Sequence, residues 1–408
     1  MKNLLSKLKK LDYIMFACVI ALIVMGVVFV KSAGSARASL ALQNLWQGHA
    51  MAATLGVFLY LFLSVIDYRK LLFWTAKPFY IISLVMLVAV LIVGTDRFGG
   101  RRWLWFFQPS EVAKLAVIMV VAQIFSRIVT PLKNRMKFDD AKLVQFEGFK
   151  AFAAGMALLG IPAFLILCEP DLGTTLVLIP AVIMMILASR LCTHWIIGMC
   201  LIGVISAGLV IGTVWTAENS TPEKRDAIYA KLPLKNHQIK RLRVFISPEA
   251  DIHGVGYNLR QSIISIGSGS LKGKGIGKGE QKALGYLPPA VSLNDFIFAV
   301  LAEEVGFMGS LAMLLLFAVL LLRGLKAAFV CDDPKGRLLA VGIVTLIFCH
   351  VYVNVAMNIG LMPITGLPLP FISAGRTFLI VVLVALGMLQ SVAVHGRKIK
   401  TKSLTEIE

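Results

Sequence analysis

Ten long apolar runs, separated by shorter polar stretches, make up most of this chain of 408 residues. They lie near residues 13–32, 49–66, 78–95, 111–130, 149–168, 172–189, 194–215, 295–322, 337–359 and 377–395. A helix needs about 20 mostly apolar residues to cross the hydrocarbon core of a bilayer, and each run comes close to that length. The pattern predicts an all-α, polytopic membrane protein with about ten transmembrane helices.

One long segment, residues 216–294, separates the seventh apolar run from the eighth. It mixes polar pieces with a glycine-rich stretch, which is typical of short amphipathic helices and turns at a membrane surface. No repeat of fixed period and no linker rich in Gly, Ser or Pro divides the chain. We therefore predict a single integral-membrane domain, residues 1–408, with 216–294 as a large extracytoplasmic loop between helices 7 and 8.

The distribution of Lys and Arg among the short loops sets the predicted orientation, because cytoplasmic loops carry the excess of basic residues. An even number of spans puts both termini on one side. With the termini in the cytoplasm, most of these basic residues fall inside. The short outer loops then hold only Lys31, Arg37, Arg97, Arg101, Arg102 and Arg376. Both termini are therefore predicted to be cytoplasmic.

Composition narrows the possible partners. Hydrophobic residues make up 58% of the chain and charged residues 15%, whereas a soluble domain carries about 25% charged residues. This balance excludes a soluble globule, a disordered chain and a disulfide scaffold. The net charge of +19, with no basic domain set apart from the spans, argues against nucleic acid. It favours anionic headgroups or a phosphate-bearing ligand.

Several ionisable residues lie at the predicted external ends of spans, where charges are costly and usually functional. Glu111, Asp171, Asp295 and Arg376 all fall at that face, beside the basic loop. Such a cluster suits an anionic headgroup substrate that reacts at the outer surface. Structural explanations stay open, because Asp171 and Asp295 are each placed to cap a helix and Glu111 lies in a first helical turn.

Other charges lie deeper. Lys114 follows Glu111 by three residues and shares its helix face, and Glu303 and Glu304 lie about two turns into the eighth span. An ion pair between Lys114 and one of these two glutamates is the structural alternative to a functional site.

The glycine-rich segment Gly273–Gly279 reads GKGIGKG. It is no P-loop, because no Gly-Lys-Ser/Thr follows a strand. Two interpretations stay open: a mobile hinge, or a flexible clamp whose backbone N–H groups and lysines hold a pyrophosphate.

Five motifs follow one another between about residue 100 and residue 376. They are Arg102-Trp103-Leu104 with Gln108-Pro109-Ser110-Glu111 and Lys114; Glu169-Pro170-Asp171-Leu172-Gly173-Thr174; Gly256-Tyr257, Gln261-Ser262 and the run from Ile266 to Gly275; Asp295-Phe296-Ile297-Phe298-Ala299 with Glu303-Glu304; and Gly366-Leu367-Pro368-Leu369-Pro370-Phe371-Ile372-Ser373. Taken together, these motifs resemble those of the SEDS proteins, the FtsW/RodA family of bacteria, whose QPDLGT is similar to residues 169–174.

The resemblance implies a peptidoglycan glycosyltransferase that polymerises lipid II at the outer face of the bacterial cytoplasmic (inner) membrane. Its implied partners are a class B penicillin-binding protein, which is a transpeptidase, and other proteins of the division or elongation complex. The family's essential acid aligns with Asp295. A carboxylate there can take the proton of the attacking sugar 4-hydroxyl.

The departing pyrophosphate needs cationic groups around it. Candidates are Arg102, Lys114, Lys272 and Lys274. The other predicted substrate-binding residues, carried over from the motifs, are Trp103, Glu111, Asp171, Gln261, Ser262, Ser373 and Arg376. A divalent cation, Mg²⁺ or Mn²⁺, is compatible with this chemistry although no ligand for it is identified, and no organic cofactor is expected.

Two segments depart from the family's pattern. Before Asp295 the family reads LPE.HTDF, whereas residues 287–296 lack that Glu, His and Thr and are two residues longer; after the last motif, Arg376 ends Ser-Ala-Gly-Arg where the family has SYGG. Two alternatives stay open. A lipid II flippase is one, because ten spans with the intramembrane charges Lys114, Glu303 and Glu304 also suit a transport path. A non-catalytic scaffold for the transpeptidase is the other, which the departures around Asp295 keep open. Residues 286–288 favour FtsW and residues 248–251 favour RodA; we lean towards FtsW.

Overall fold

The computed structural model describes residues 7, 9–35, 43–97, 100–105, 107–135, 141–169, 171–189, 193–232, 236–247, 249, 251, 254–286, 288 and 292–396. In this part of the chain, ten helices are long and apolar enough to cross a membrane. They are α2 (Tyr13–Ser35), α4 (Leu45–Val65), α5 (Tyr68–Val93), α6 (Pro109–Arg135), α7 (Ala141–Cys168), α8 (Leu172–Ser189), α9 (Thr193–Glu218), α15 (Ile297–Val330), α16 (Pro334–Asn358) and α17 (Arg376–His395). The predicted all-α, ten-span architecture is confirmed.

Three spans differ from the prediction by eight residues or more. The fifth, α7, begins at Ala141 rather than near residue 149. The third helix begins at Tyr68 rather than near residue 78, and the eighth continues to Val330 rather than ending near residue 322. The third span was placed too late because its first turns carry Arg69, Lys70 and Lys77. Asp67 caps that helix by accepting from Arg69 N at 2.9 Å, so the helix starts in a polar layer and enters the apolar one later.

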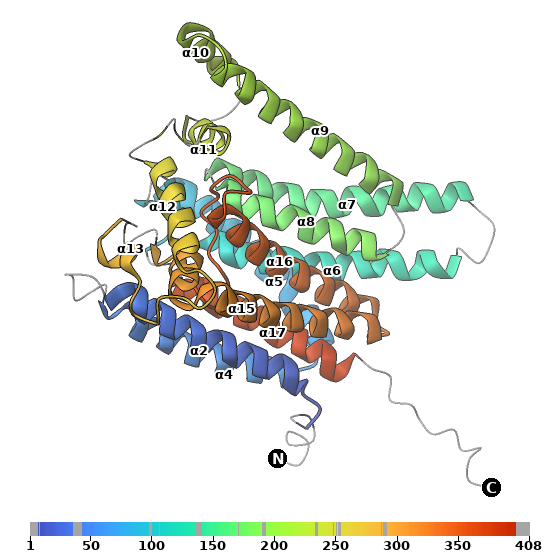
Figure 1. The fold of residues 1–408 in the computed structure, drawn as a ribbon. Coiled ribbons are helices and arrows are strands. Elements are labelled where there is room, and N and C mark those ends of the chain that lie inside the picture. The colour runs from blue at the N-terminus through green and yellow to red at the C-terminus, as the bar shows by residue number, and fades with distance from the viewer. Residues whose placement is uncertain are drawn as a thin grey trace.

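Between α9 and α15 the described residues include four short helices, as the mixed polar and glycine-rich pattern predicted. They are α10 (Pro222–Lys231), α11 (Asn236–Ile246), α12 (Val255–Ser268) and α13 (Glu280–Ala283). A small antiparallel hairpin, β1 (Thr95–Arg97) and β2 (Gly100–Trp103), connects α5 to α6, with Thr95 opposite Trp103. Figure 1 shows α11, α12 and α13 together at one end of the bundle.

We call that end the loop face and define it by Ser32, Asp171, Asp295 and Lys282. The other end, the opposite face, holds Asp12, where α2 begins, and Gly396, just after α17. There Asp12 pairs with Arg323 of α15, and Asp332 N donates to Gly396 O at 3.2 Å. The first and last long helices therefore begin and end at the same face (Figure 1). This arrangement agrees with an even number of spans.

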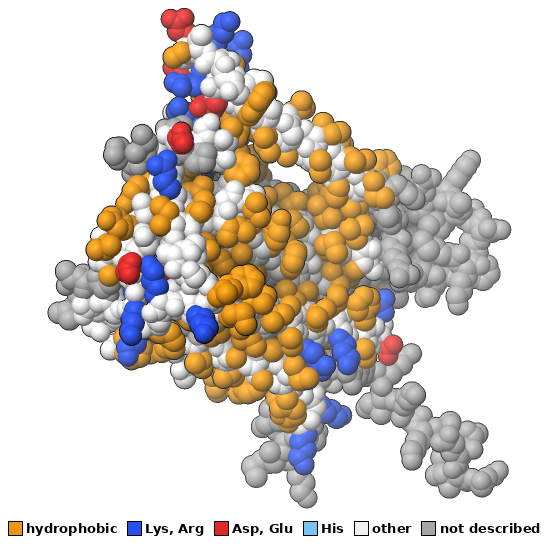
Figure 2. All heavy atoms as spheres, in the orientation of Figure 1, with side chains coloured by type: hydrophobic (Ala, Val, Ile, Leu, Met, Phe, Trp, Pro, Cys, Tyr) orange, Lys and Arg blue, Asp and Glu red, His pale blue; other side chains and the backbone are white. Residues whose placement is uncertain are grey.

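The helices differ greatly in how deeply they are buried. Within its most apolar window α6 is 89% buried, whereas α9 is only 6% buried. Helix α9 diverges from α7 and α8 in Figure 1, and hydrophobic side chains cover the flanks of the molecule in Figure 2. Exposed apolar flanks are what a bilayer-facing surface requires. The protein is thus a multi-pass membrane protein in which α6, α16 and α17 form the centre.

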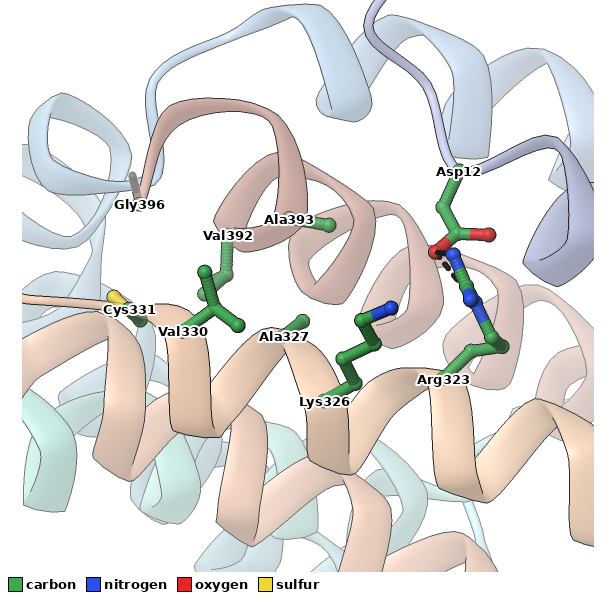
Figure 3. Close-up of a pocket in the computed structure, with 9 residues that line it drawn as sticks. All are labelled: Asp12, Arg323, Lys326, Ala327, Val330, Cys331, Val392, Ala393 and Gly396. Atoms are coloured by element: carbon green, nitrogen blue, oxygen red, sulfur yellow. Dashed lines mark hydrogen bonds and ion pairs between the residues drawn. The ribbon is translucent and has the colours of Figure 1, made fainter. Parts of the chain in front are cut away.

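A pocket lies at the opposite face, between the end of α15 and the end of α17 (Figure 3). Its lining includes the ion pair of Asp12 and Arg323, together with Lys326 and Cys331. None of the residues singled out by the motifs lines it. The candidate chemistry therefore lies at the loop face, on the other side of the bundle.

Candidate active site

Asp295 lies in the turn just before α15, with its backbone held from α16. Its carbonyl oxygen accepts from Asn354 Nδ2 at 2.9 Å and from Asn358 Nδ2 at 3.0 Å. The N-cap of α15 is Phe296, without a side-chain cap. Asp295 therefore does not cap the helix, and the structural alternative considered for it is wrong. Its half-buried carboxylate makes no hydrogen bond or ion pair with any described residue.

The segment before Asp295 is also held by the loop that precedes α17. Ser373 Oγ donates to Asn294 O at 2.7 Å and accepts from Leu369 N at 2.8 Å. Ala374 N donates to Leu293 O at 3.0 Å. Ser373 is buried, so its hydroxyl positions the turn that carries Asp295.

Arg241 of α11 is a cation beside this carboxylate that the motifs did not reveal. Its Nη1 donates to Thr365 O at 3.0 Å. The adjoining Gly366 has φ 76°, and a Cβ built on it would lie 3.4 Å from Asp295 Oδ2 and 3.8 Å from Arg241 Nη2. The two side chains therefore flank the same glycine. The only signal for Arg241 in the sequence was the basic run of residues 240–243 in an amphipathic helix.

The ionisation of Asp295 is shifted by this environment. Burial raises the pKa of its carboxyl to about 6, although Arg241 and Arg102 oppose the rise and Asp171 adds to it. At neutral pH the group is mostly ionised and still basic enough to accept a proton from a hydroxyl in a transition state.

Asp171 stands at the start of α8 and caps it. Its Oδ1 accepts from Thr174 N at 3.1 Å and its Oδ2 from Thr174 Oγ1 at 2.8 Å. Gln108 Nε2 also donates to Oδ2 at 3.1 Å, and Arg102 Nη1 lies 3.9 Å from Oδ1. Asp171 therefore joins the hairpin, α6 and α8 at the loop face, in addition to its capping function.

Glu111 and Lys114 form a buried ion pair within α6, with Glu111 Oε2 at 2.8 Å from Lys114 Nζ. Nζ also lies 2.8 Å from Nε2 of His350 on α16 and packs over the ring of Phe378. Lys114 therefore pairs with Glu111 and not with Glu303 or Glu304, so the structural alternative considered for those glutamates does not hold. The contacts of Lys114 with His350 and Phe378 hold α6 against α16 and α17.

Glu303 and Glu304 instead bind the glycine-rich segment. Lys274 Nζ lies 3.0 Å from Glu303 Oε1, and the buried Lys282 pairs with Glu304. Gly306 breaks α15 with φ 67° and ψ −166°, which lets the segment approach so closely that its backbone hydrogen-bonds the two glutamates' carbonyls.

In this structure the glycine-rich segment is bound to the two glutamate carboxylates. Glu303 Oε1 accepts from the backbone N–H groups of Glu280 and Gln281, at 2.7 and 3.1 Å, and Glu304 Oε2 accepts from Gly277 N at 3.0 Å. The side chains of Lys274 and Lys282 are likewise paired with these two carboxylates. We call this set of contacts the clasp.

The remaining predicted residues are distributed around the loop face. Ser262 is buried and donates to Asn358 O at 2.9 Å, so it fixes α12 to α16. Gln261 and Trp103 are half-buried, and Lys272 is exposed. Arg376 is exposed at the start of α17 and lies against Gly48 of α4.

The structure therefore brings Asp295, Arg102 and Asp171 together among the predicted residues, and it adds Arg241, which was not predicted.

Comparison with known proteins decides the family. A family model described as a cell cycle protein, FtsW/RodA/SpoVE, matches residues 12–398. The chain belongs to this family. FtsW/RodA/SpoVE proteins are the group whose motifs the sequence resembled, so the recognition of SEDS motifs is confirmed.

Curated relatives within the FtsW/RodA/SpoVE family carry several names. The peptidoglycan glycosyltransferase MrdB of Escherichia coli K12 is 34% identical over 81% of this chain and 80% of its own. The stage V sporulation protein E of Bacillus subtilis is 32% identical over 95% and 98%. The probable peptidoglycan glycosyltransferase FtsW of Geobacter metallireducens is 32% identical over 95% and 96%. Relatives from different branches thus match at similar identity.

Solved structures of the family share the fold. A chain of a peptidoglycan synthase complex that coordinates polymerization and crosslinking superposes with a TM-score of 0.69 at 26% identity, covering 94% of this chain and 97% of that one. The rod shape determining protein RodA of Thermus thermophilus superposes with a TM-score of 0.64 at 24% identity, over 95% and 98%. The ten-helix arrangement is therefore that of the family.

Proposed function

We propose that this protein is a peptidoglycan glycosyltransferase that joins lipid II units into glycan strands. The names of its relatives support this proposal. The structural observation that carries it is Asp295: a half-buried carboxylate at the loop face, held rigidly by its own backbone, bound by no described side chain and flanked by Arg241. Such a group is pre-positioned to accept a proton from a bound substrate.

In the proposed step, the 4-hydroxyl oxygen of one disaccharide attacks the anomeric carbon of another. The hydroxyl proton passes to the Asp295 carboxylate as the new carbon–oxygen bond forms. The bond from the anomeric carbon to the pyrophosphate breaks, and its electron pair leaves with the polyprenyl pyrophosphate. Because a single displacement occurs and no second carboxylate acts as nucleophile, we expect inversion at the anomeric carbon.

Arg102 and Arg241 are the cations best placed to stabilise the departing pyrophosphate, because both act electrostatically on Asp295. Lys114 and Lys274, proposed for this purpose from the sequence, are held in ion pairs with Glu111 and Glu303. Fixed cations in a partly dehydrated site lower the energy of the developing charge without reorganising.

A divalent cation remains a proposal without a protein site. In the described part of the chain, no group of three or more His, Cys, Asp or Glu side chains is placed to hold a metal ion. Mg²⁺ commonly enters such reactions bound to the substrate's phosphates and water, and we propose that route here. The steps above use only the chain's own residues.

We further propose that the loop face lies outside the cytoplasmic membrane and that both termini lie in the cytoplasm, as the basic residues of the short loops indicate. A class B penicillin-binding protein is the proposed partner, supported by the fold shared with a chain of a peptidoglycan synthase complex. Relatives named FtsW and MrdB match equally well in identity, so division remains a preference taken from the sequence.

The test is polymerisation of labelled lipid II by the purified protein with its partner transpeptidase. Wild type should produce glycan strands and release polyprenyl pyrophosphate, and Asp295→Asn should reduce the rate by about 10²–10⁴-fold. Asp226→Asn, on the exposed side of α10, is the matched control and should behave as wild type. Movement of lipid II across vesicles without release of polyprenyl pyrophosphate would show a flippase instead. Full polymer from Asp295→Asn would overturn the catalytic assignment.

A further inference from the structure

Glu169 stands between α7 and α8 with a carboxyl group that has no hydrogen-bond partner. The side chain is fully buried, and neither Oε1 nor Oε2 contacts a donor among the described residues. A buried polar group without a partner destabilises the fold, and an unpaired buried charge destabilises it more. The family's motif, QPDLGT, has glutamine where this chain has Glu169.

The surroundings of Glu169 disfavour its ionised form. It follows the last turn of α7, where its N–H donates to Leu165 O and Ile166 O, so it meets the negative end of the helix dipole. The charged groups that act on it are Asp171, two residues away, and Arg102 from the hairpin. Burial raises the pKa of Glu169 to about 8, with Asp171 adding to the rise and Arg102 opposing it.

Arg102 connects this buried carboxyl to the active site. Its Nε donates to the backbone oxygen of Glu169 at 3.3 Å, while its Nη1 faces Asp171 at 3.9 Å. The guanidinium is thus attached to the main chain of the residue whose side chain lacks a partner. When Glu169 loses its proton, Arg102 is the cation in position to pair with it.

We propose that Glu169 is a positioning residue that controls the anion-binding capacity of the active site: when protonated it does not compete with the substrate's pyrophosphate for the Arg102 guanidinium, and when ionised it does. This inference rests on the proposed function and specifies how that site is regulated. It predicts weaker binding of lipid II at alkaline pH, with little change in the chemical step at Asp295.

The test measures KM and kcat for lipid II polymerisation between pH 6.5 and pH 9. In wild type, KM should rise by about tenfold for each pH unit above the pKa of Glu169, since one proton is lost, while kcat changes little. Glu169→Gln cannot ionise and should keep a low KM throughout. Arg102→Gln should show a high KM at every pH and no alkaline rise. Glu223→Gln, exposed on α10, is the matched control and should follow wild type.

Infrared titration gives a readout independent of activity. The carbonyl band of a buried protonated carboxyl should be present in wild type at pH 7, disappear as the pH rises through about 8, and be absent from Glu169→Gln. An alkaline rise in KM that persists in Glu169→Gln, or a wild-type KM that stays flat to pH 9, would overturn the inference. A wild-type protein that makes no polymer at any pH refutes the proposed function itself, which is a separate result.

Discussion

Oδ2 of Asp295 and Nη2 of Arg241 both lie beside the same glycine, Gly366. A Cβ on Gly366 would lie 3.4 Å from the first atom and 3.8 Å from the second. Asp295 comes from the turn before α15, Arg241 from α11, and Gly366 from the loop between α16 and α17. Three segments that are distant in sequence therefore define the geometry of one carboxylate.

Asp295 should set the acid limb of the pH–rate profile. Its pKa is raised to about 6, so kcat/KM should fall as the pH drops below that value and the base becomes protonated. Arg241 favours the ionised form, so Arg241→Gln should move the acid limb to higher pH. The measurement is kcat/KM for lipid II from pH 5 to pH 8. Arg225→Gln on α10 is the control, and an acid limb unchanged by Arg241→Gln would contradict the assigned contact.

Gly366→Ala should impair both folding and activity through the backbone. The residue has φ 76°, a conformation that costs a residue with a Cβ about 1–2 kcal/mol. Relief of that strain would shift Asp295 or Arg241 away from the glycine. Thermal unfolding in detergent and the polymerisation rate measure the two effects. Gly267→Ala, in α12 with open space around it, should lose neither stability nor rate.

Breaking the clasp should destabilise the loop face. Lys282→Met leaves the buried Glu304 carboxylate without its cation, and removing one partner of a buried pair costs about 3–5 kcal/mol. The double variant Lys282→Met/Glu304→Gln should recover part of that loss because the charge is gone. Lys272→Met, on the same segment but exposed, should stay within about 0.5 kcal/mol of wild type. Equal stability of Lys282→Met and Lys272→Met would show that the clasp contributes little.

Glu169 should also make stability depend on pH. Its pKa rises from 4.5 when exposed to about 8 in the fold, so the folded state binds the proton more tightly than the unfolded state. Stability should therefore fall as the pH rises from about 4.5 and level off above about 8, with a total loss of up to about 5 kcal/mol. Glu169→Gln should unfold at a higher temperature than wild type at pH 8 and show a flatter pH dependence. A lower unfolding temperature for Glu169→Gln at pH 8 would exclude this account.

The contacts of the clasp could not be predicted from the sequence. The charges of Glu303 and Glu304 were recognised as unusual, but the only partner considered for them was Lys114, as a structural alternative to a functional site. Their actual partners, Lys274 and Lys282, reach them because Gly306 interrupts α15. A glycine inside an apolar run is ordinary in a membrane helix, so the break carried no signal of its own.

What the sequence by itself determined is the set of ten spans, the alternation that returns both ends to one face, and the motifs that place Asp295 at the other. These follow from local properties: the length of an apolar run decides whether it can cross a bilayer, and each crossing reverses direction.

Only the tertiary structure decided which side chains surround that carboxylate. Arg241 is fixed to the backbone of Thr365, 124 residues away, and Arg102 to that of Glu169, 67 residues away. Such contacts depend on how the helices pack and on the path of the segment between α9 and α15, and the free energy that selects them is shared among distant parts of the chain.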